Sequence, residues 1–394
     1  MSEIEHGSIE EEEGLSGLVS GWVEIGFEGV REAFAENLRS GAELGATFAV
    51  VRHGQTVVDL WGGFDGPDRQ HPLDRDALFT LWSTTKGLSA IAIAMLVDRG
   101  KLDYETPVAT WWPDFAAGGK SNVTLGELMS HQAGLCGADQ PVSIEDFLGH
   151  SRVAEVLAAQ TPFFEPGTAW GYHALTIGIL ADELVRRADG RSIGAFFADE
   201  VAGPLGIDAY LGLPESEDGR HVAIIPPALL SAPDTESPNM RARDAVRSNP
   251  PLNPGWTDRR DWRAAGLSSA GGVSNARSLA RLYGALAAGG EIDGVRLLSP
   301  GSITAAVRER ICGPDQVEGT PGRYAAGFRL NINEIMGPGQ SAYGHPGWGG
   351  SVAFADPDAG IGAAYVMSQM QAYAPGDDPR VNRLLAATYA ALNR

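Results

Sequence analysis

The stretch Leu81-Trp82-Ser83-Thr84-Thr85-Lys86-Gly87 places a serine and a lysine three residues apart, at the start of an apolar segment that predicts a helix to about Arg99. Residues three apart lie on the same face of a helix, so these two side chains are expected to meet. A serine hydroxyl becomes a good nucleophile only when a neighbouring base takes its proton. Lysine can be that base if burial or nearby cations suppress its charge. The pair therefore predicts a serine hydrolase whose primary base is not a histidine.

Lysine is rare in this chain, which makes the pair more informative. Only Lys86, Lys101 and Lys120 stand among 30 basic residues, so nearly all the positive charge is arginine. Arginine could not replace Lys86 as a base, because a guanidinium group does not deprotonate in proteins. The structural alternative is an ordinary helix start, since a four-residue motif also occurs by chance.

Composition limits the classes of function. The 394 residues suffice for a large core and suggest two or three lobes, and a hydrophobic content of 43% is ordinary for a globular protein. The formal net charge of -20 argues against nucleic acid or an anionic membrane surface as a partner. It leaves a small neutral substrate open.

Neither the start of the chain nor its cysteines indicate targeting, disulfides or metal. Residues 1–18 form an acidic tail with four consecutive glutamates at 10–13, and lack the basic start and apolar stretch of a secretory signal. No apolar run is long enough to span a bilayer. Cys136 and Cys312 make no disulfide framework and no metal pattern. We therefore expect a cytoplasmic protein without metal or cofactor.

Strand signals occur at both ends of the chain and helical signals in the middle. They predict one sheet domain built from residues 19–100 and 266–394, with a mainly helical domain inserted at 101–265, in which 226–262 is an irregular excursion. The predicted strands are 47–51, 56–61, 325–332, 351–355 and 361–367. The predicted helices include an amphipathic one at 19–38, others at 124–130, 144–148, 151–159, 175–187 and 192–201, one capped at Ser274, and a last one at 379–392.

Tyr172 is the first candidate for a second proton carrier, which acyl transfer needs for the leaving group. It follows the Pro166-Gly167 turn and precedes the helix at 175–187, so its side chain can point from a loop into a cleft. A phenol near cationic groups loses its proton more readily. The alternatives are a core tyrosine hydrogen-bonded to a carbonyl, or His173 as the base.

The segment Tyr343-Gly344-His345-Pro346-Gly347-Trp348-Gly349-Gly350-Ser351 is the second candidate. Glycines beside a strand let a substrate approach the backbone closely. An edge strand also has unpaired N–H groups that can bind an oxyanion. A tight hairpin with a structural histidine would give the same composition.

These three segments together resemble the motifs of serine β-lactamases and penicillin-binding proteins, which occur in the order S-x-x-K, Y-x-N and K-T-G. The chain is most similar to the β-lactamase-like carboxylesterases, called family VIII esterases, and to class C β-lactamases. The resemblance runs from about residue 20 to the end. It implies an α/β (α+β) fold of the β-lactamase/DD-peptidase type, with an antiparallel sheet flanked by helices. The supporting stretches lie at 128–135, 203–207 and 271–273.

The resemblance also implies the roles of the residues. Ser83 would be the acyl nucleophile, Lys86 its base and Tyr172 the group that moves protons to the leaving group and activates water. The backbone N–H groups of Ser83 and Trp348 would form the oxyanion hole, and His345 and Gly347 would bind substrate. In an alternative register, Trp348-Gly349-Gly350 is the third motif and Ser351 supplies the second N–H group.

Two departures from the motifs bear on the substrate. Ala174 replaces the asparagine of Y-x-N and cannot hydrogen-bond an acyl amide. His345 and Pro346 replace the lysine and threonine of K-T-G, a segment that helps hold the substrate carboxylate in β-lactamases. A histidine is mostly neutral at pH 7, and proline has no hydroxyl or N–H group. Both changes weaken recognition of a β-lactam and leave the machinery for ester cleavage intact.

The sequence therefore predicts a carboxylesterase that hydrolyses short-chain or aromatic esters through a Ser83 acyl-enzyme. A β-lactamase, DD-peptidase or amidase with the same centre is the alternative, and a non-catalytic binding protein on this fold is a third hypothesis. The expected partner is a small ester, with neither nucleic acid nor membrane, and the oligomeric state is not predicted.

Overall fold

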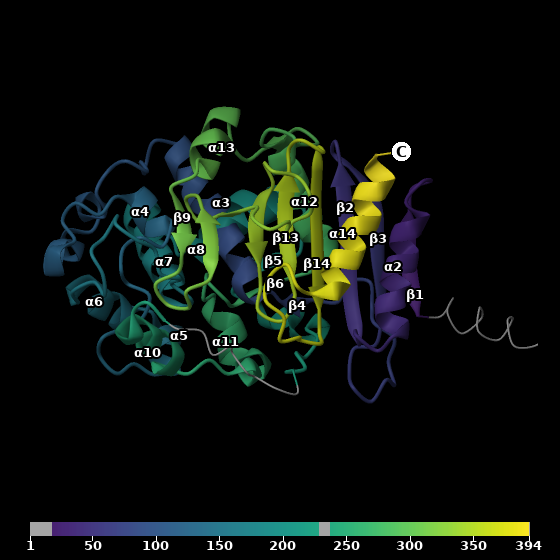
Figure 1. Ribbon diagram of the computed structural model, residues 1–394, viewed down its shortest axis with the longest axis horizontal. Helices are drawn as coiled ribbons and strands as arrows, with labels where there is room; N and C mark the ends of the chain where they lie inside the picture. The colour runs from purple at the N-terminus through teal and green to yellow at the C-terminus, as the bar shows by residue number, and fades with distance from the viewer. Residues whose placement is uncertain (1–17, 228–236, 394) are drawn as a thin grey trace, which may run out of the picture.

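One antiparallel sheet of nine strands organises the molecule (Figure 1). The computed structural model describes residues 18–227 and 237–393, so the predicted acidic tail lies outside the described residues except for Leu18. Both ends of the chain contribute strands to this sheet, and every neighbouring pair is antiparallel, which confirms the predicted fold class. The strands in spatial order are β1 (Val19–Val23), β3 (Gln55–Gly63), β2 (Gly45–Arg52), β14 (Ile361–Met367), β13 (Val352–Asp356), β12 (Tyr343–Pro346), β11 (Arg329–Leu330), β10 (Pro321–Tyr324) and β9 (Ile311–Pro314).

Helices cover both faces of the sheet. Gly362 of β14 faces helix α12 (Ala276–Ala287), so closely that a Cβ atom there would lie 2.0 Å from the amide nitrogen of Gly284. Tyr365, three residues along the same strand, therefore faces the opposite side. Its hydroxyl bonds to Glu43, which also pairs with the helix α14 (Pro379–Leu392). Figure 1 shows α14 across this near face of the sheet, beside α2 (Glu28–Arg39).

The middle of the chain is mainly helical and lies at one end of the sheet (Figure 1). Helix α3 (Thr85–Asp98) runs between the two parts and is buried at every residue from Thr85 to Leu96, as expected for a helix that is apolar all round. The predicted domain boundaries at residues 100 and 265 stay a prediction. The other helices here are α4 (Leu125–Met129), α5 (Ile144–Gly149), α6 (Ser151–Ala159), α7 (Thr176–Asp189), α8 (Ile193–Phe197), α9 (Gly203–Leu205), α10 (Met240–Ser248) and α11 (Arg260–Ala265).

The predicted helix at 19–38 is wrong in its first third, because residues 19–23 form the edge strand β1. Gly21 has φ +99°, and a Cβ atom there would lie 2.0 Å from the carbonyl oxygen of Asp59 in the neighbouring strand. Gly26 also has a positive φ, which ends the strand before α2 begins. The apolar residues keep a helical spacing across the boundary between β1 and α2, so this spacing did not indicate where the strand ends.

Other predicted elements are shorter or more regular than expected. The strand at 325–332 reduces to β11, because Gly327 (φ +88°) turns the chain between β10 and β11. The predicted helix at 192–201 consists of α8 and a π-helical turn at 198–202. The predicted cap Ser274 belongs to a strand, and Asn275 caps α12 instead. The excursion at 226–262 contains α10 and the start of α11, and residues 228–236 lie outside the described residues.

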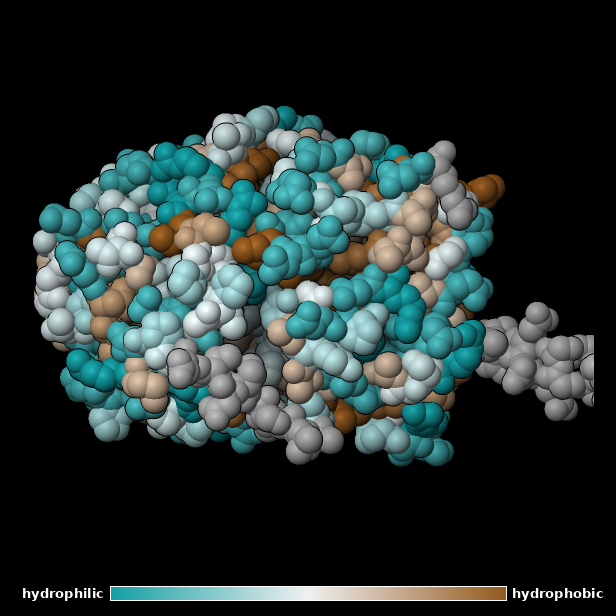
Figure 2. Space-filling model, in the orientation of Figure 1, coloured by the Kyte–Doolittle hydropathy of each residue, from teal (hydrophilic) through white to brown (hydrophobic). Residues whose placement is uncertain are grey.

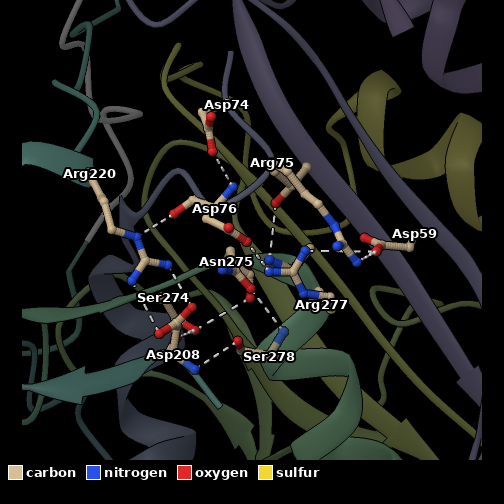
Figure 3. A network of polar contacts seen from close by, with 12 residues as sticks. Asp59, Asp74, Arg75, Asp76, Asp208, Arg220, Ser274, Asn275, Arg277 and Ser278 are labelled. Carbon is tan, nitrogen blue, oxygen red and sulfur yellow. Dashed lines mark hydrogen bonds and ion pairs between the residues drawn. The ribbon is translucent and has the colours of Figure 1, made fainter. Parts of the chain in front are cut away.

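A small second sheet leads into the Ser83 segment. Strand β4 (Phe79–Thr80) pairs with β6 (Gly272–Ser274), which also pairs with β5 (Ala209–Leu211). Ion pairs and hydrogen bonds beside this sheet join segments that are distant in sequence (Figure 3). Arg220 binds Asp208 before β5, and Arg277 binds Asp76 before β4. These contacts fix the strand that ends three residues before Ser83.

Hydrophilic residues cover most of the face of the molecule in Figure 2, in keeping with the net charge of -20. In the part of the chain that the structure describes, no helix is both long and apolar enough to cross a lipid bilayer.

Candidate active site

Ser83 lies in a short 3-10 turn (Trp82–Thr84) immediately before α3, and not in the α-helix itself. The preceding residue, Trp82, has φ +48° and is only 2% exposed. An aromatic residue rarely adopts this left-handed backbone conformation, which costs free energy unless the surroundings enforce it. The Trp82 ring packs against Trp348 at 4.9 Å and Trp262 at 5.9 Å. Packing of these rings therefore holds the backbone that presents Ser83.

Lys86 lies where a general base for Ser83 must lie. Its Nζ is 3.1 Å from Ser83 Oγ, and it donates to the carbonyl oxygens of Ala174 (2.8 Å) and Ser269 (2.9 Å). Burial lowers the pKa of Lys86 well below its ordinary value, and no carboxylate in the described parts of the chain pairs with it. A neutral amine has two N–H groups and one lone pair. Because the two carbonyl oxygens take the N–H groups, the lone pair is left for the hydroxyl proton of Ser83.

Tyr172 joins this pair from the loop before α7. Its backbone N–H donates to Asp315 Oδ1 at 3.0 Å, its ring lies 4.8 Å from Lys86 Nζ, and its hydroxyl bonds to the Ser83 side chain. Burial raises the pKa of Tyr172 far above its ordinary value, outweighing its hydrogen bond with Ser83 and the charge of Arg329. The expectation that nearby cations make this phenol lose its proton readily is wrong. Tyr172 is a proton donor in this state.

His173, the alternative base, is occupied by the backbone. Its Nε2 accepts from the N–H of Leu135 at 3.1 Å, and its Nδ1 donates to the carbonyl oxygen of Gly171 at 2.6 Å. The residue is fully buried. Both ring nitrogens therefore have structural partners, and neither is available to Ser83.

His345 lies on β12 beside the tyrosine. Its ring is stacked against that of Tyr172, with centroids 6.1 Å apart, and its Nδ1 donates to the carbonyl oxygen of Pro346 at 2.6 Å. Burial lowers the pKa of His345 well below its ordinary value. The ring is therefore neutral, and its Nε2 is a buried acceptor without a partner among the described residues.

Gly347 brings the third segment against the nucleophile turn. A Cβ atom at Gly347 would lie 2.4 Å from the carbonyl oxygen of Leu81, so no side chain fits there. The Ser351 hydroxyl donates to that same carbonyl oxygen at 2.8 Å and lies 3.1 Å from Thr84 Oγ1. Gly347 donates its own N–H to the carbonyl oxygen of Ser351. Its N–H group is therefore already bonded, and its role in substrate binding stays a prediction.

The N–H groups of Ser83, Trp348 and Ser351 have no acceptor within the described residues. Each of them is therefore free to bind an oxyanion. The geometry is therefore compatible with both registers of the third motif: the second oxyanion donor is the N–H group of Trp348 in one register and that of Ser351 in the other.

Arg380, which no sequence motif indicated, fixes the loop that carries these donors. Its Nη2 donates to the carbonyl oxygen of Gly349 at 2.8 Å, and its other nitrogens bind Glu43 and Asp378. The side chain is 1% exposed. Because a buried guanidinium needs all of these partners, α14 and the loop are held together.

Sequence reasoning also missed the carbonyl groups that orient Lys86, and it missed Tyr324. The Tyr324 ring packs on His131 at 5.0 Å and lies 6.5 Å from the rings of Tyr172 and His345. Backbone carbonyl groups carry no residue type, so no pattern of letters could have indicated those of Ala174 and Ser269.

Acid is expected to destabilise the folded protein through its buried histidines. Burial lowers the pKa of His131, His173 and His345, to about 4 for His173. Because an unfolded histidine titrates near 6.5, the unfolded chain binds protons between pH 6.5 and 4 that the folded chain does not bind. The free energy of unfolding should therefore fall as the pH is lowered from 6.5 to 4, by about 1.4 kcal/mol per pH unit for each such histidine.

Urea denaturation at stepped pH measures this slope. The variant His173→Asn serves as the comparison, because carboxyl groups contribute equally to both proteins. Below pH 6.5, the free energy of unfolding of the variant should fall less steeply than that of the wild-type protein. The difference between the two slopes should correspond to about one bound proton. Identical slopes in the two proteins would contradict the account of His173.

Comparisons with known proteins agree with this arrangement. The family model described as Beta-lactamase matches residues 30–388. The chain is 35% identical over 390 residues to the Esterase/beta-lactamase LipL of Mycobacterium tuberculosis, covering 93% of this chain and 87% of that protein. It is 43% identical to a family VIII carboxylesterase of known structure (TM-score 0.90), with 95% of this chain and 99% of that one covered. A penicillin-binding protein homolog from Caulobacter crescentus is 41% identical, with a TM-score of 0.89 and the same coverage.

Proposed function

This chain belongs to the beta-lactamase family, and on that premise we propose that it is a carboxylesterase acting on short-chain or aromatic esters through a serine acyl-enzyme. The observation that carries the proposal is the buried amine of Lys86, 3.1 Å from Ser83 Oγ, with both N–H groups held by carbonyl oxygens. A lysine that is neutral at pH 7 can take the serine proton.

Acylation follows from these positions. Ser83 Oγ transfers its proton to Lys86 Nζ and attacks the ester carbonyl carbon. The carbonyl oxygen becomes an oxyanion bound by the N–H of Ser83 and that of Trp348 or Ser351. When the tetrahedral intermediate collapses, Tyr172 donates its proton to the departing alkoxide and regains one from the Lys86 ammonium. Alcohol leaves, and Lys86 is neutral again.

Deacylation repeats the steps with water as the nucleophile. Water gives a proton to Lys86 Nζ as its oxygen attacks the acyl-enzyme carbonyl carbon, and the same N–H groups bind the oxyanion. Collapse expels Ser83 Oγ, which is reprotonated by Tyr172, and the Lys86 ammonium restores the tyrosine proton. The products are the carboxylic acid and the free enzyme.

Ester cleavage is favoured over β-lactam cleavage by what surrounds the centre. Position 174 is alanine, which offers a substrate amide no side-chain hydrogen bond, and its carbonyl oxygen is already bonded to Lys86. His345 is buried and neutral, so it provides no positive charge for a β-lactam carboxylate. An alkoxide also departs more readily than an amine.

A substrate panel tests the proposal. We expect kcat/KM for p-nitrophenyl acetate and butyrate to exceed that for nitrocefin at least tenfold, and a serine-directed alkyl phosphonate to label the Ser83 peptide. Preference for nitrocefin would indicate a β-lactamase, and the absence of both turnover and labelling would indicate a non-catalytic binding protein. Mass spectrometry of the labelled protein identifies the serine.

A further inference from the structure

Arg329 of β11 lies beside Tyr324, one of the aromatic residues around Tyr172. It pairs directly with Tyr324 of β10 on one side and with Gly344 of β12 on the other. Directly paired residues of antiparallel strands point to the same face of the sheet. The Arg329 Cζ atom lies 5.9 Å from the centre of the Tyr324 ring, which itself lies 6.5 Å from the ring of Tyr172. Gly344, its direct partner on β12, has no side chain that could lie over the guanidinium.

No carboxylate in the described part of the chain pairs with Arg329. Its buried Nε has no acceptor, and the residue makes no ion pair. Two nearby arginines differ: Arg310 pairs with Glu105, and Arg323 pairs with Glu309. Burial dominates the shifts in the pKa of Tyr172 and of His345, but the positive charge of Arg329 acts on both as well. The cation is therefore within electrostatic reach of the reacting groups and is not neutralised there.

An uncompensated guanidinium beside the centre is a carboxylate site. Arginine presents a planar fork of N–H donors that matches a carboxylate in a bidentate manner. The net charge of -20 would repel an anionic substrate in general, so such a substrate needs a local cation to be held.

We propose that Arg329 binds a carboxylate carried by the alcohol part of the ester, so that the enzyme prefers esters of hydroxy acids, such as acylated hydroxybenzoates. This inference rests on the proposed function. The alcohol part is assigned because Arg329 is placed, through Tyr324, beside Tyr172, which protonates the departing alkoxide in the proposed mechanism. Arg329 is thus a specificity-determining residue for the leaving group.

Matched pairs of esters test the assignment. The charged probe is p-butyryloxybenzoate and the neutral one is its methyl ester, and the readout is the ratio of their kcat/KM values. Arg329→Met should lower this ratio roughly tenfold to a hundredfold, the range for a charge-assisted hydrogen bond. Arg329→Lys should keep part of the preference. The control Arg323→Met removes a neighbouring arginine that already has a carboxylate, and should leave the ratio unchanged.

Three results would overturn the assignment. Unchanged kcat/KM values for both esters in Arg329→Met would remove Arg329 from recognition. An equal loss for both esters, which also leaves the ratio unchanged, would make its role structural. A second pair of esters, mono-p-nitrophenyl glutarate and p-nitrophenyl butyrate, carries the carboxylate on the acyl part. If Arg329→Met lowers the preference for the glutarate and leaves the ratio for the two benzoate esters unchanged, the bound carboxylate belongs to the acyl part.

Binding separates this inference from the proposed function. If the wild-type protein hydrolyses neither these two esters nor p-nitrophenyl acetate and butyrate, the proposed function fails. Calorimetric binding of p-hydroxybenzoate to Ser83→Ala, and its loss in Ser83→Ala/Arg329→Met, would still support the carboxylate site. Equal affinity in the two proteins would contradict it.

Discussion

Replacing Ser83 with alanine is expected to lower kcat/KM for p-nitrophenyl butyrate on the order of a thousandfold or more. The change removes the oxygen that interacts with both the Lys86 amine and the Tyr172 side chain, and with it the acyl-enzyme. The oxyanion donors are backbone groups and stay in place, so weak hydrolysis above the rate in buffer is the expected remainder. Steady-state kinetics measures the loss, and the phosphonate should no longer label the protein.

The fold should tolerate this change. Ser83 is only partly buried, and among the residues that the structure describes its hydroxyl has no partner besides the two reacting groups. The melting temperature should therefore stay within a few degrees of the wild-type value. Ser89→Ala is the matched control, because Ser89 lies in α3, which directly follows the Ser83 turn, and its hydroxyl donates to the carbonyl oxygen of Ser268 instead of to a reacting group. Ser89→Ala should remain active, and full activity in Ser83→Ala would remove Ser83 from the mechanism.

Local geometry explains why the nucleophile and base could be predicted from sequence. A spacing of three residues at a helix start brings two side chains together whatever the rest of the fold does. The position of Tyr172 came from the order of the motifs, and the structure brings it to the same place. Its protonation could not be predicted, because the sequence does not state how deeply a loop residue is buried, and burial sets the direction of its pKa.

Features that depend on pairing between strands distant in the chain could not be predicted from the sequence. The strand β1 forms because Val19–Val23 pair with β3, some 40 residues later along the chain, whereas the local spacing of apolar residues indicated a helix. Arg329 becomes part of the site for the same kind of reason. Its neighbours Tyr324 and Gly344 are set by the register of two strand pairs, and a single residue of slip would turn its side chain to the other face.

The charge of Lys86 distinguishes two possible roles of this residue. A cation beside Ser83 could stabilise an oxyanion, whereas a neutral amine can take a proton. The structure favours the second role, because the amine is fully buried and its acceptors are carbonyl oxygens without full negative charge. A cation at this depth would need a carboxylate, which the described residues do not supply.

Lys86→Arg and Lys86→Met are therefore expected to lose activity alike, with kcat/KM for p-nitrophenyl butyrate lowered about a hundredfold to ten-thousandfold, the range for a lost general base. Arginine keeps the positive charge but cannot accept the proton of Ser83. If Lys86 acted as a cation, Lys86→Arg would retain most of the activity. That result would contradict the assignment of Lys86 as the base. Lys101→Met is the control, because it removes an exposed lysine that pairs with Asp189 far along the chain. For the wild-type protein, kcat/KM should fall as acid protonates the amine, and this acidic limb should begin well below the ordinary pKa of lysine, because burial lowers the pKa of Lys86.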